Sequence, residues 1–395
     1  MIIPATGRDD RIDALRGFAL LGILLVNIQS FVWGGTNPAG YLQEGASTFD
    51  HVLFFLSCAF VNMKFMPLFA LLFGVGFSLL LDKLRTLTSA PHAVFRRRML
   101  FLFGFGVLHG IFFYYGDITQ MYAMAGLVLL AYDRRSTDSL RRAVVLWWVG
   151  AFALTVLLTW SLAGNVPDPL ETAAELEGNF LLFTGESYLA QLPTRANLFL
   201  DIAIANLIGL PLAVALMLTG LLAHRSGWLL DRRSKAWRTA LAIGLAIGLP
   251  SALVYGGLLY VEADQYRLGA YSAVAAVPGM VSVALAFAYA ALFFTRASPD
   301  LVRWLAPAGR MPLTNYLLQS VAMGALLSGW GLALGARLGY AQTTLLAIAI
   351  FAVQLLLSRW WIGRFKQGPL EGAWRAWTYH RMPPPMASSP PRSGE

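Results

Sequence analysis

Residues 11–27 read RIDALRGFALLGILLVN, and the apolar run that they begin continues to Trp33. Three charged side chains come first, and the residues after them are apolar as far as Asn27. A helix needs about 20 predominantly apolar residues to cross the hydrocarbon core of a bilayer. We therefore expect residues Ala14–Trp33 to form a membrane-spanning helix whose charged end lies at the membrane surface.

The same pattern recurs along the whole chain. Of its 395 residues, 57% are hydrophobic and 13% are charged, and the mean hydropathy is +0.60. A soluble chain has about 45–50% apolar and about 25% charged residues, so this composition excludes an ordinary soluble enzyme. Because helices satisfy their own backbone groups in lipid, we expect an all-α, polytopic integral membrane helix bundle. Hydropathy predicts about ten spans, at residues 14–33, 52–81, 98–115, 118–132, 143–162, 200–224, 239–261, 270–295, 311–334 and 341–362.

The basic residues predict the orientation of these spans. If the chain crosses the bilayer ten times, 26 of the 30 Lys and Arg residues fall on one side. Three fall on the other side, namely Arg195, Arg267 and Arg337, and Lys64 lies within a span. Cytoplasmic loops carry an excess of Lys and Arg, so we expect both termini in the cytoplasm. The net charge of +9 lies in these short clusters without a basic, aromatic-rich patch, and we expect no nucleic acid partner.

Composition divides the chain into three parts. Residues 1–365 are expected to form the transmembrane bundle. Residues 366–380 carry Trp374, Trp377 and Tyr379 among Lys and Arg, a pattern typical of an amphipathic helix on the inner leaflet. Residues 381–395 are rich in Pro and Ser, and we expect them to be disordered.

Charged residues inside or beside the spans are candidates for function, since they are costly in a membrane. Asp13 and Arg16 are three residues apart and share a helix face. They are interpreted either as an anion-binding or partner site at the cytoplasmic mouth, or as a structural ion pair. Lys64 lies in the middle of the second predicted span, near Pro67, which we expect to kink that helix. It either binds an anionic group or pairs with a buried carboxylate.

His109 is the candidate general base, because its unperturbed pKa lies near neutrality. Asp117 and Tyr122 follow it. In a continuous helix, His109 and Asp117 would lie about 12 Å apart, but Gly110 and Gly116 permit a break that brings them together. The alternative is a structural histidine. Asn27, in the first span, is interpreted as a catalytic amide or as a polar contact between helices.

A polar stripe follows Gly309-Arg310-Met-Pro312. It consists of Thr314, Asn315, Gln319 and Ser320, and Asn315 and Gln319 share one helix face. The stripe predicts either a cavity lining or hydrogen bonds between helices. With one cysteine and scattered histidines, no metal-ligand spacing is present, and we expect no metal.

Five segments together resemble the YeiB-like family of bacterial membrane proteins, domain-of-unknown-function family 418. The segments are RIDALRGFALLGILLVN (11–27), KFMPLFALLFGVGF (64–77), HG…GDI within 109–122, GRMPLTNYLLQ (309–319) and QGPLEGAWR (367–375). They span nearly the whole chain. The resemblance implies a multi-pass protein of the bacterial inner membrane.

The opening motif also resembles transmembrane acyltransferases, which begin with Asp-x-x-Arg-Gly entering a first helix and include acyltransferase-3 proteins and heparan-glucosaminide N-acetyltransferases. An Asn stands at the position of Asn27 in the latter. Their catalytic His follows that helix, whereas this chain has no His between Asn27 and His51. The resemblance implies acyl transfer with His109 as the base, Asn27 stabilising the oxyanion and Asp117 orienting the imidazole.

The expected donor is cytoplasmic acyl-CoA, bound near Arg16 and Arg310, and the expected acceptor is an amine or hydroxyl at the outer side, carried by a small molecule, a glycan or a lipid. A small-metabolite transporter that uses the same buried Lys, His and Asp is the main alternative. A non-catalytic membrane partner or sensor is a further one. The sequence leaves the acyl chain, the acceptor and the oligomeric state open.

Overall fold

The computed structural model describes residues 9–33, 38–42, 45–163, 168–264 and 271–380, and every regular element among them is helical. The expected disorder of residues 381–395 lies outside these ranges. The α-helices are α1 (Asp10–Trp33), α2 (Thr48–Phe60), α3 (Phe65–Leu87), α4 (Pro91–Phe112), α5 (Thr119–Leu129), α6 (Thr137–Ala163), α7 (Pro169–Gly185), α8 (Tyr188–Arg225), α9 (Lys235–Ile243), α10 (Leu249–Asp264), α11 (Ser272–Ser282), α12 (Ala284–Arg296), α13 (Pro299–Arg310), α14 (Pro312–Leu327), α15 (Tyr340–Ile362) and α16 (Pro369–Tyr379). Short 3₁₀ or π turns are η1 (Pro38–Tyr41), η2 (Leu130–Tyr132), η3 (Gly244–Gly248) and η4 (Leu334–Ala336).

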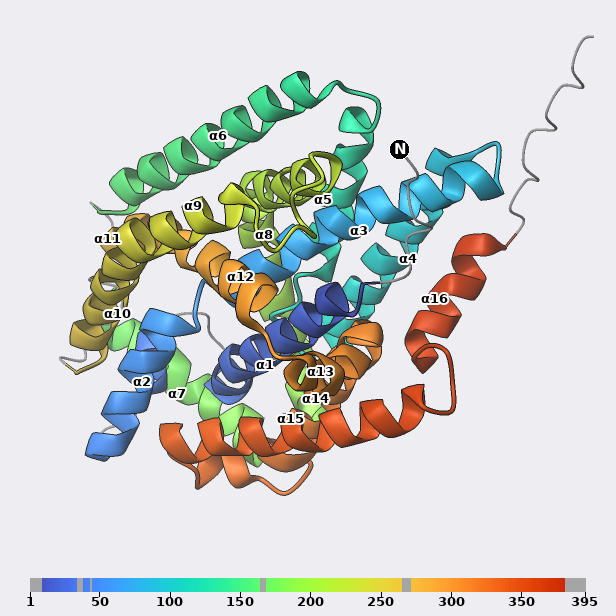
Figure 1. Ribbon diagram of the computed structural model, residues 1–395. Coiled ribbons are helices and arrows are strands. Elements are labelled where there is room, and N and C mark those ends of the chain that lie inside the picture. Colours follow the sequence, from blue (N-terminus) through green and yellow to red (C-terminus); the bar gives the residue numbers. More distant parts are fainter. Residues whose placement is uncertain (1–8, 34–37, 43–44, 164–167, 265–270, 381–395) are drawn as a thin grey trace, which may run out of the picture.

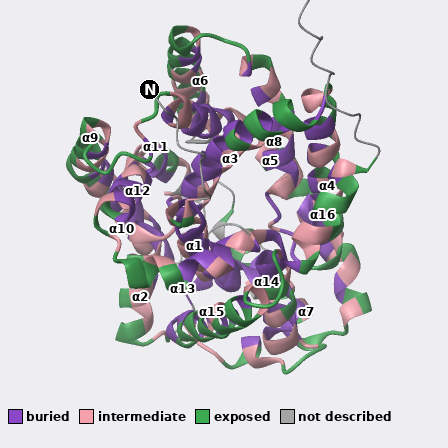
Figure 2. Cartoon of the chain, turned by 45° about the vertical axis from the view of Figure 1, so that its right-hand side comes forward, coloured by how far each residue is buried: buried purple, intermediate pink, exposed green. Residues whose placement is uncertain are grey.

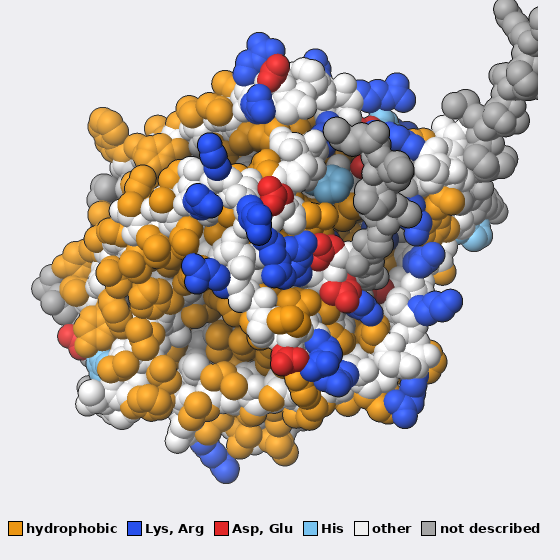
Figure 3. Space-filling model, in the orientation of Figure 1, with side chains coloured by type: hydrophobic (Ala, Val, Ile, Leu, Met, Phe, Trp, Pro, Cys, Tyr) orange, Lys and Arg blue, Asp and Glu red, His pale blue; other side chains and the backbone are white. Residues whose placement is uncertain are grey.

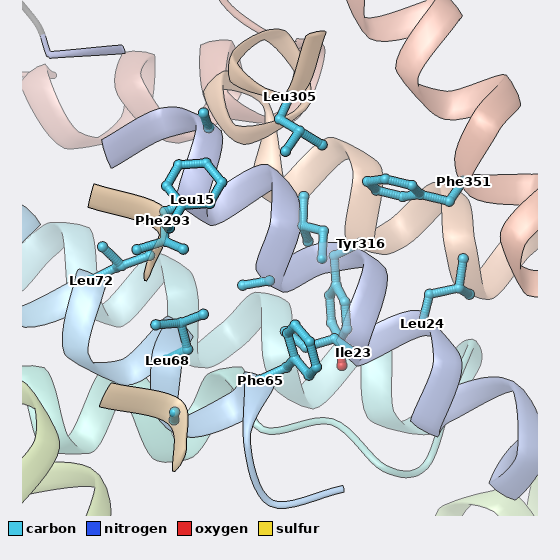
Figure 4. Packing of buried hydrophobic residues seen from close by; sticks show 14 of the residues in the cluster. Leu15, Ile23, Leu24, Phe65, Leu68, Leu72, Phe293, Leu305, Tyr316 and Phe351 are labelled. Carbon is cyan, nitrogen blue, oxygen red and sulfur yellow. The ribbon is translucent and has the colours of Figure 1, made fainter. Parts of the chain in front are cut away.

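The first helix is the axis of the fold. α1 packs against α3, α13, α14 and α15, and it runs through the middle of the molecule (Figure 1). Leu15 and Leu24 on α1 are fully buried, and they lie among side chains from the surrounding helices (Figure 4). A Cβ on Gly309 would lie 1.7 Å from the carbonyl oxygen of Asp13, so α1 and α13 approach more closely than any larger residue allows.

Seven segments are long and apolar enough to cross a membrane. They are Asp10–Phe31, Thr48–Leu87, Thr137–Ser161, Tyr188–Arg225, Lys235–Asp264, Ala273–Arg296 and Tyr340–Ile362. The protein is therefore a helical membrane protein. Three of the ten predicted spans correspond to elements outside this set, namely α4, α5 and α14. Helix α6 covers one side of the bundle, and only 11% of the residues in its most apolar 18-residue stretch are buried (Figure 2).

Many basic side chains gather in one region of the surface. In the view of Figure 3, Lys and Arg lie in a band across the molecule, with hydrophobic side chains around it. Arg11 and Arg16 belong to the start of α1, and Arg310 at the end of α13 meets the same surface through its contacts with Asp10 and Asp13. We refer to this region as the basic face.

The second predicted span is broken, and the expected proline kink is wrong. α2 ends at Phe60, α3 begins at Phe65, and Met63 between them has a positive φ of 61°. Pro67 occupies the first turn of α3, where its missing N–H has no intrahelical acceptor in any case. The chain thus changes direction before the proline, at residues 61–64.

Other boundaries also differ from the predicted ones. The segments before residue 200 and before residue 311 were expected to be loops, but they contain α7, the start of α8 and α13. Local caps explain two of these helices: Asp168 accepts from the N–H of Leu170 at 2.9 Å, and Ser298 accepts from that of Leu301 at 3.2 Å. The helix expected over 311–334 ends at Leu327, and α16 forms within 366–380.

The chain reverses between α4 and α5 inside the molecule. Residues 113–118 join the two helices, and Tyr114, Tyr115 and Asp117 within this turn are buried, with exposed fractions of 4%, 2% and 0%. Non-helical backbone at membrane depth is tolerated where protein covers it. Here the cover comes from α8: Tyr188 donates to the carbonyl of Phe112 at 2.7 Å, and Asn206 donates to that of Asp117 at 2.9 Å.

Candidate functional site

The reversal after α4 brings His109 and Asp117 into direct contact. The backbone N–H groups of Phe113 and Tyr114 both donate to the carbonyl of His109, so the helix ends within four residues of it. His109 Nδ1 then lies 2.8 Å from Asp117 Oδ2. The break that the glycines permit therefore occurs.

Asp117 is held rigidly and is fully buried. Its Oδ1 accepts from the backbone N–H of Thr119 at 2.7 Å and from the Thr119 hydroxyl at 2.8 Å, which is an Asx turn at the start of α5. Gly106 packs against this turn, because a Cβ there would lie 2.8 Å from Asp117 Oδ1. The other carboxylate oxygen is left to accept from His109.

The second ring nitrogen of His109 faces a serine. Nε2 lies 2.9 Å from Ser320 Oγ on α14, and both side chains are buried. An ionised carboxylate only accepts hydrogen bonds, so in the tautomer with the proton on Nδ1, His109 donates to Asp117 and presents the lone pair of Nε2 to the hydroxyl. The rings of Phe105, Phe113 and Tyr316 lie against the imidazole, at centroid distances of 5.6, 6.0 and 4.6 Å.

Ser320 is the site residue that sequence reasoning missed. It was placed in the polar stripe but given no role in a site. The only signal in the sequence was that it follows Gln319 at the end of that stripe. Its partner His109 lies 211 residues earlier, a pairing that spacing does not reveal.

The other residues of the stripe join helices. Asn315 Nδ2 donates to Ser358 Oγ on α15 at 3.0 Å, and Gln319 Nε2 donates to Gln354 Oε1 at 3.0 Å. Gln354 in turn donates to the carbonyl of Asn315 at 3.0 Å. These contacts correspond to the helix-joining alternative for Asn315 and Gln319.

Among the described residues, neither Asn27 nor Tyr122 forms a hydrogen bond with His109. The Ser30 hydroxyl donates to the Asn27 carbonyl at 3.1 Å and lies 2.5 Å from the Tyr114 hydroxyl in the α4–α5 turn. No hydrogen bond of the Asn27 side chain is formed within the described part of the chain. Tyr122 donates to the carbonyl of Met66 at 2.7 Å, in the first turn of α3.

Lys64 is fully buried at the break between α2 and α3. Its ammonium lies 5.1 Å from the centre of the Tyr255 ring, a cation–π distance. Nζ has no hydrogen-bond partner among the described residues, and no carboxylate of those residues forms an ion pair with it. The buried Lys–carboxylate pair that the sequence left open is therefore absent from the described part of the chain.

At the basic face, the candidate anion-binding residues engage carboxylates. Arg16 donates to Asp13 Oδ1 at 3.1 Å and to the carbonyl of Leu72 at 3.4 Å. Arg310 donates to Asp10 Oδ1 at 2.5 Å, and its Nε lies 3.7 Å from Asp13 Oδ2. Arg16 and Arg310 thus share Asp13, and each side chain keeps about a quarter of its surface exposed.

Two of the quoted sequence segments meet at the start of α14. Glu371 of α16 accepts from the backbone N–H groups of Leu313 and Thr314, at 2.7 and 3.1 Å, and from the Thr314 hydroxyl at 2.6 Å. A carboxylate at a helix N-terminus accepts hydrogen bonds from the unpaired backbone N–H groups and interacts favourably with the helix dipole. α16 thus fixes the helix that carries Ser320.

Arg195 is a further buried residue that the sequence placed in an outer loop. It lies in α8 with an exposed fraction of 2%, donating to Gln191 Oε1 at 2.8 Å and to the carbonyl of Phe112 at 3.4 Å. A cation at the C-terminus of α4 is favourable for the helix dipole. Among the described residues, no group of three His, Cys, Asp or Glu side chains lies close enough to hold a metal ion.

One protein family and three uncharacterised bacterial proteins match this chain. Residues 223–381 match the family described as "Protein of unknown function (DUF418)". The chain is 32% identical to "Uncharacterized protein YeiB" of Escherichia coli (strain K12) over 427 aligned residues, which cover 97% of this chain and 99% of that protein. It is 30% identical to "Uncharacterized 39.9 kDa protein in amylase 3'region" of Bacillus acidopullulyticus, with 95% and 96% covered, and 24% identical to "Uncharacterized protein YxaH" of Bacillus subtilis (strain 168), with 93% and 93% covered. No solved structure matches the chain.

Proposed function

The chain belongs to the DUF418 family of YeiB-like proteins, and from this premise we propose that it is a membrane acyltransferase. It transfers an acyl group from cytoplasmic acyl-CoA to a hydroxyl or amine acceptor at the outer side of the membrane. The observation that carries the proposal is the buried chain of hydrogen bonds from Asp117 through His109 to a hydroxyl.

This arrangement supplies what acyl transfer requires. The attacking hydroxyl or amine must lose a proton, and a general base must lie within about 2.6–3.2 Å of it. His109 Nε2 meets that distance to the hydroxyl it contacts, and Asp117 fixes the tautomer that leaves Nε2 free to accept. Burial among aromatic rings excludes water, which strengthens the electrostatic interaction between Asp117 and a protonated His109.

The basic face is proposed as the entry for acyl-CoA. Phosphate groups compete well with carboxylates for Arg, since both accept paired N–H donors. In the proposal, CoA phosphates displace Asp10 and Asp13 from Arg310 and Arg16. Asn27, whose side-chain amide is unpaired among the described residues, serves as the donor to the oxyanion or to the acceptor.

The remaining candidate residues have supporting roles in this scheme. Asn315 and Gln319 hold α14 in place, and Tyr122 supports the first turn of α3. Lys64 is proposed to bind an anionic group of the acceptor, because a buried ammonium without a hydrogen-bond partner gains most from an anion.

Lys64 also favours the second candidate function. Acyl transfer does not require an intramembrane ammonium, whereas ionisable residues inside spans commonly mark substrate and ion pathways. In a small-metabolite transporter, Lys64 would bind the anionic cargo and His109 would carry a proton. Outward-open and inward-open states of the same protein would support this function.

The proposed location is the bacterial inner membrane, with both termini in the cytoplasm. Seven candidate spans support a multi-pass arrangement. The placement of both termini in the cytoplasm is supported by the charge split over ten crossings. Reporter fusions after Arg135 and after Gly164 should lie on opposite sides, because α6 separates the two positions. If both reporters give the same side, the proposed orientation of α6 is wrong.

The enzymatic proposal is tested by release of CoA. Purified protein in detergent is mixed with acetyl-CoA and a lipid and glycan extract, and the free thiol is measured. The wild type should release CoA, and His109→Ala should lose this activity. His51→Ala is the matched control, since His51 lies in α2 and stays partly exposed. Equal turnover of folded wild type and His109→Ala would remove His109 as the base.

A further inference from the structure

The hydroxyl of Ser320 lies closer to His109 than to the carbonyl of its own helix. Serine and threonine inside helices usually donate to the carbonyl four residues earlier. In this chain, Thr219, Thr295 and Thr378 make that bond at 2.7, 2.6 and 2.6 Å. Ser320 lies 3.5 Å from the corresponding carbonyl of Tyr316, but 2.9 Å from His109 Nε2. With Nε2 as the acceptor, the shorter contact is the one from the Ser320 hydroxyl to the imidazole.

The order of groups is that of a nucleophile, a base and an orienting carboxylate. Nucleophilic acyl transfer needs a hydroxyl within hydrogen-bond reach of a base that a third group orients. The two distances of 2.9 and 2.8 Å meet this requirement. Both oxygens of Asp117 are engaged, one by Thr119 and one by His109, so the imidazole has one preferred orientation.

We propose that Ser320 Oγ accepts the acyl group before the final acceptor does, so that transfer occurs in two steps through an acyl-serine. This inference rests on the proposed acyltransferase function. In the first step, the Ser320 hydroxyl gives its proton to His109 Nε2, and Oγ bonds to the thioester carbon. The carbon–sulfur bond then breaks, and the leaving thiolate takes the proton from His109 to give free CoA.

The second step uses the same groups in reverse. The acceptor hydroxyl or amine gives a proton to His109 Nε2 and bonds to the carbon of the serine ester. The bond from that carbon to Oγ breaks, and Ser320 regains the proton from His109. No oxidant or further reactant is needed.

The position of Ser320 suits a relay between two sides of the bundle. It lies eight residues after Pro312, about 12 Å along α14 from the basic face. The donor and the acceptor then never need to occupy the site together. The aromatic rings around His109 offer an apolar environment for the bound acyl group.

The experiment looks for the covalent intermediate without an acceptor. The full-length protein in detergent is mixed with acetyl-CoA alone, quenched in acid and examined by intact-protein and peptide mass spectrometry. The wild type should gain one acetyl group on the peptide that contains Ser320 and release an equal amount of CoA. Ser320→Ala should lose the acetyl group, and its CoA release should fall about 10³-fold or more.

Two further variants keep the test decisive. Ser282→Ala removes another buried helical serine, which donates to the carbonyl of Gly279, and it should acetylate as the wild type does. Ser320→Cys retains the size of the side chain, so it remains informative if the alanine variant does not fold. The introduced thiol should hold the acetyl group as a thioester that neutral hydroxylamine removes.

The possible results of this experiment distinguish failure of the acyl-serine inference from failure of the proposed acyltransferase function. If Ser320→Ala still releases CoA at the wild-type rate when an acceptor is present, the acyl group is transferred directly. The acyl-serine is then wrong, while the acyltransferase function stands. An acetyl group found on another residue also overturns the inference. If the wild type neither acetylates nor releases CoA with any acceptor extract, the proposed function itself fails.

Discussion

Replacing Gly106 with alanine should disturb the histidine site from a distance of one helix turn. A Cβ at this position would lie 2.5 Å from Thr119 Oγ1 and 2.8 Å from Asp117 Oδ1. These distances are 0.9 Å and 0.6 Å below the 3.4 Å at which ordinary van der Waals contact begins. The start of α5 must therefore move away from α4, and it takes the Asp117 carboxylate with it.

The displacement is large compared with the tolerance of the hydrogen bond. The bond between His109 Nδ1 and Asp117 Oδ2 is 2.8 Å long, and a movement of about half an ångström lengthens it beyond the usual 3.2 Å limit. Overpacking of this kind costs about 1–3 kcal/mol. A misplacement of about 1 Å in a catalytic site lowers the rate by about 10²-fold.

The same helix offers a matched control. A Cβ at Gly104 would have no atom within 4 Å, so Gly104→Ala should gain about 0.5–1 kcal/mol from reduced backbone entropy in the unfolded chain. The free energies of unfolding of the two variants, measured in mixed micelles, should differ by about 1.5–4 kcal/mol. Release of CoA should fall in Gly106→Ala alone. Equal stability and equal activity of the two variants would refute the described packing of Asp117.

Three further predictions follow from charged residues. Lys64→Met should keep the unfolding free energy or raise it by about 1 kcal/mol, because the ammonium has no carboxylate partner among the described residues; a fall of more than about 2 kcal/mol would reveal a partner. Glu371→Gln should destabilise the fold by about 1–2 kcal/mol through weaker capping of α14. Glu177→Gln, at an exposed position of α7, should leave the stability unchanged, and equal thermal midpoints of the two variants would contradict the capping role. Burial raises the pKa of Asp133, but hydrogen bonds from His92 and Arg85 outweigh it and hold that pKa below its ordinary value of 3.8. The stabilisation by ionised Asp133 is therefore present above pH 3.8 and lost as the pH falls through the lower folded pKa. Asp133→Asn should cost about 2 kcal/mol at neutral pH, less than the loss of a fully buried pair, because Arg85 is 40% exposed. A difference in unfolding free energy between this variant and the wild type that persists at the lowest pH would contradict this assignment.

Hydropathy predicted where most helices lie because burial in lipid imposes a strong and local constraint on each span. It did not predict the break at residues 61–64, because the apolar residues on both sides of this segment look like one continuous span. It also missed α13, whose Ser298 cap and first-turn Pro299 were visible but lay in a segment too short and too charged for a span.

The candidate site was predictable only in part. The contact between His109 and Asp117 depended on a local break that nearby glycines permit. The contact between Ser320 and His109 joins residues 211 positions apart on α14 and α4, and no local pattern in the sequence predicts it. Asn315 and Gln319 carry the same polar signal as Ser320, and only the identity of their partners separates a helix contact from a candidate nucleophile.

The buried reversal between α4 and α5 has a consequence for the order of membrane insertion. With 11 residues, α5 is about 16 Å long and cannot cross a bilayer alone, so it must enter the membrane paired with α4. Asn206, which pairs with the carbonyl of Asp117, is synthesised 89 residues later. During translation, the polar turn must therefore stay at the insertion machinery or in a water-filled vestibule until α8 emerges. The single cysteine, Cys58, lies in α2, so the test uses a cysteine introduced into the α4–α5 turn of a variant without Cys58. Truncation of the nascent chain before α8 should leave this cysteine accessible to water-soluble thiol reagents.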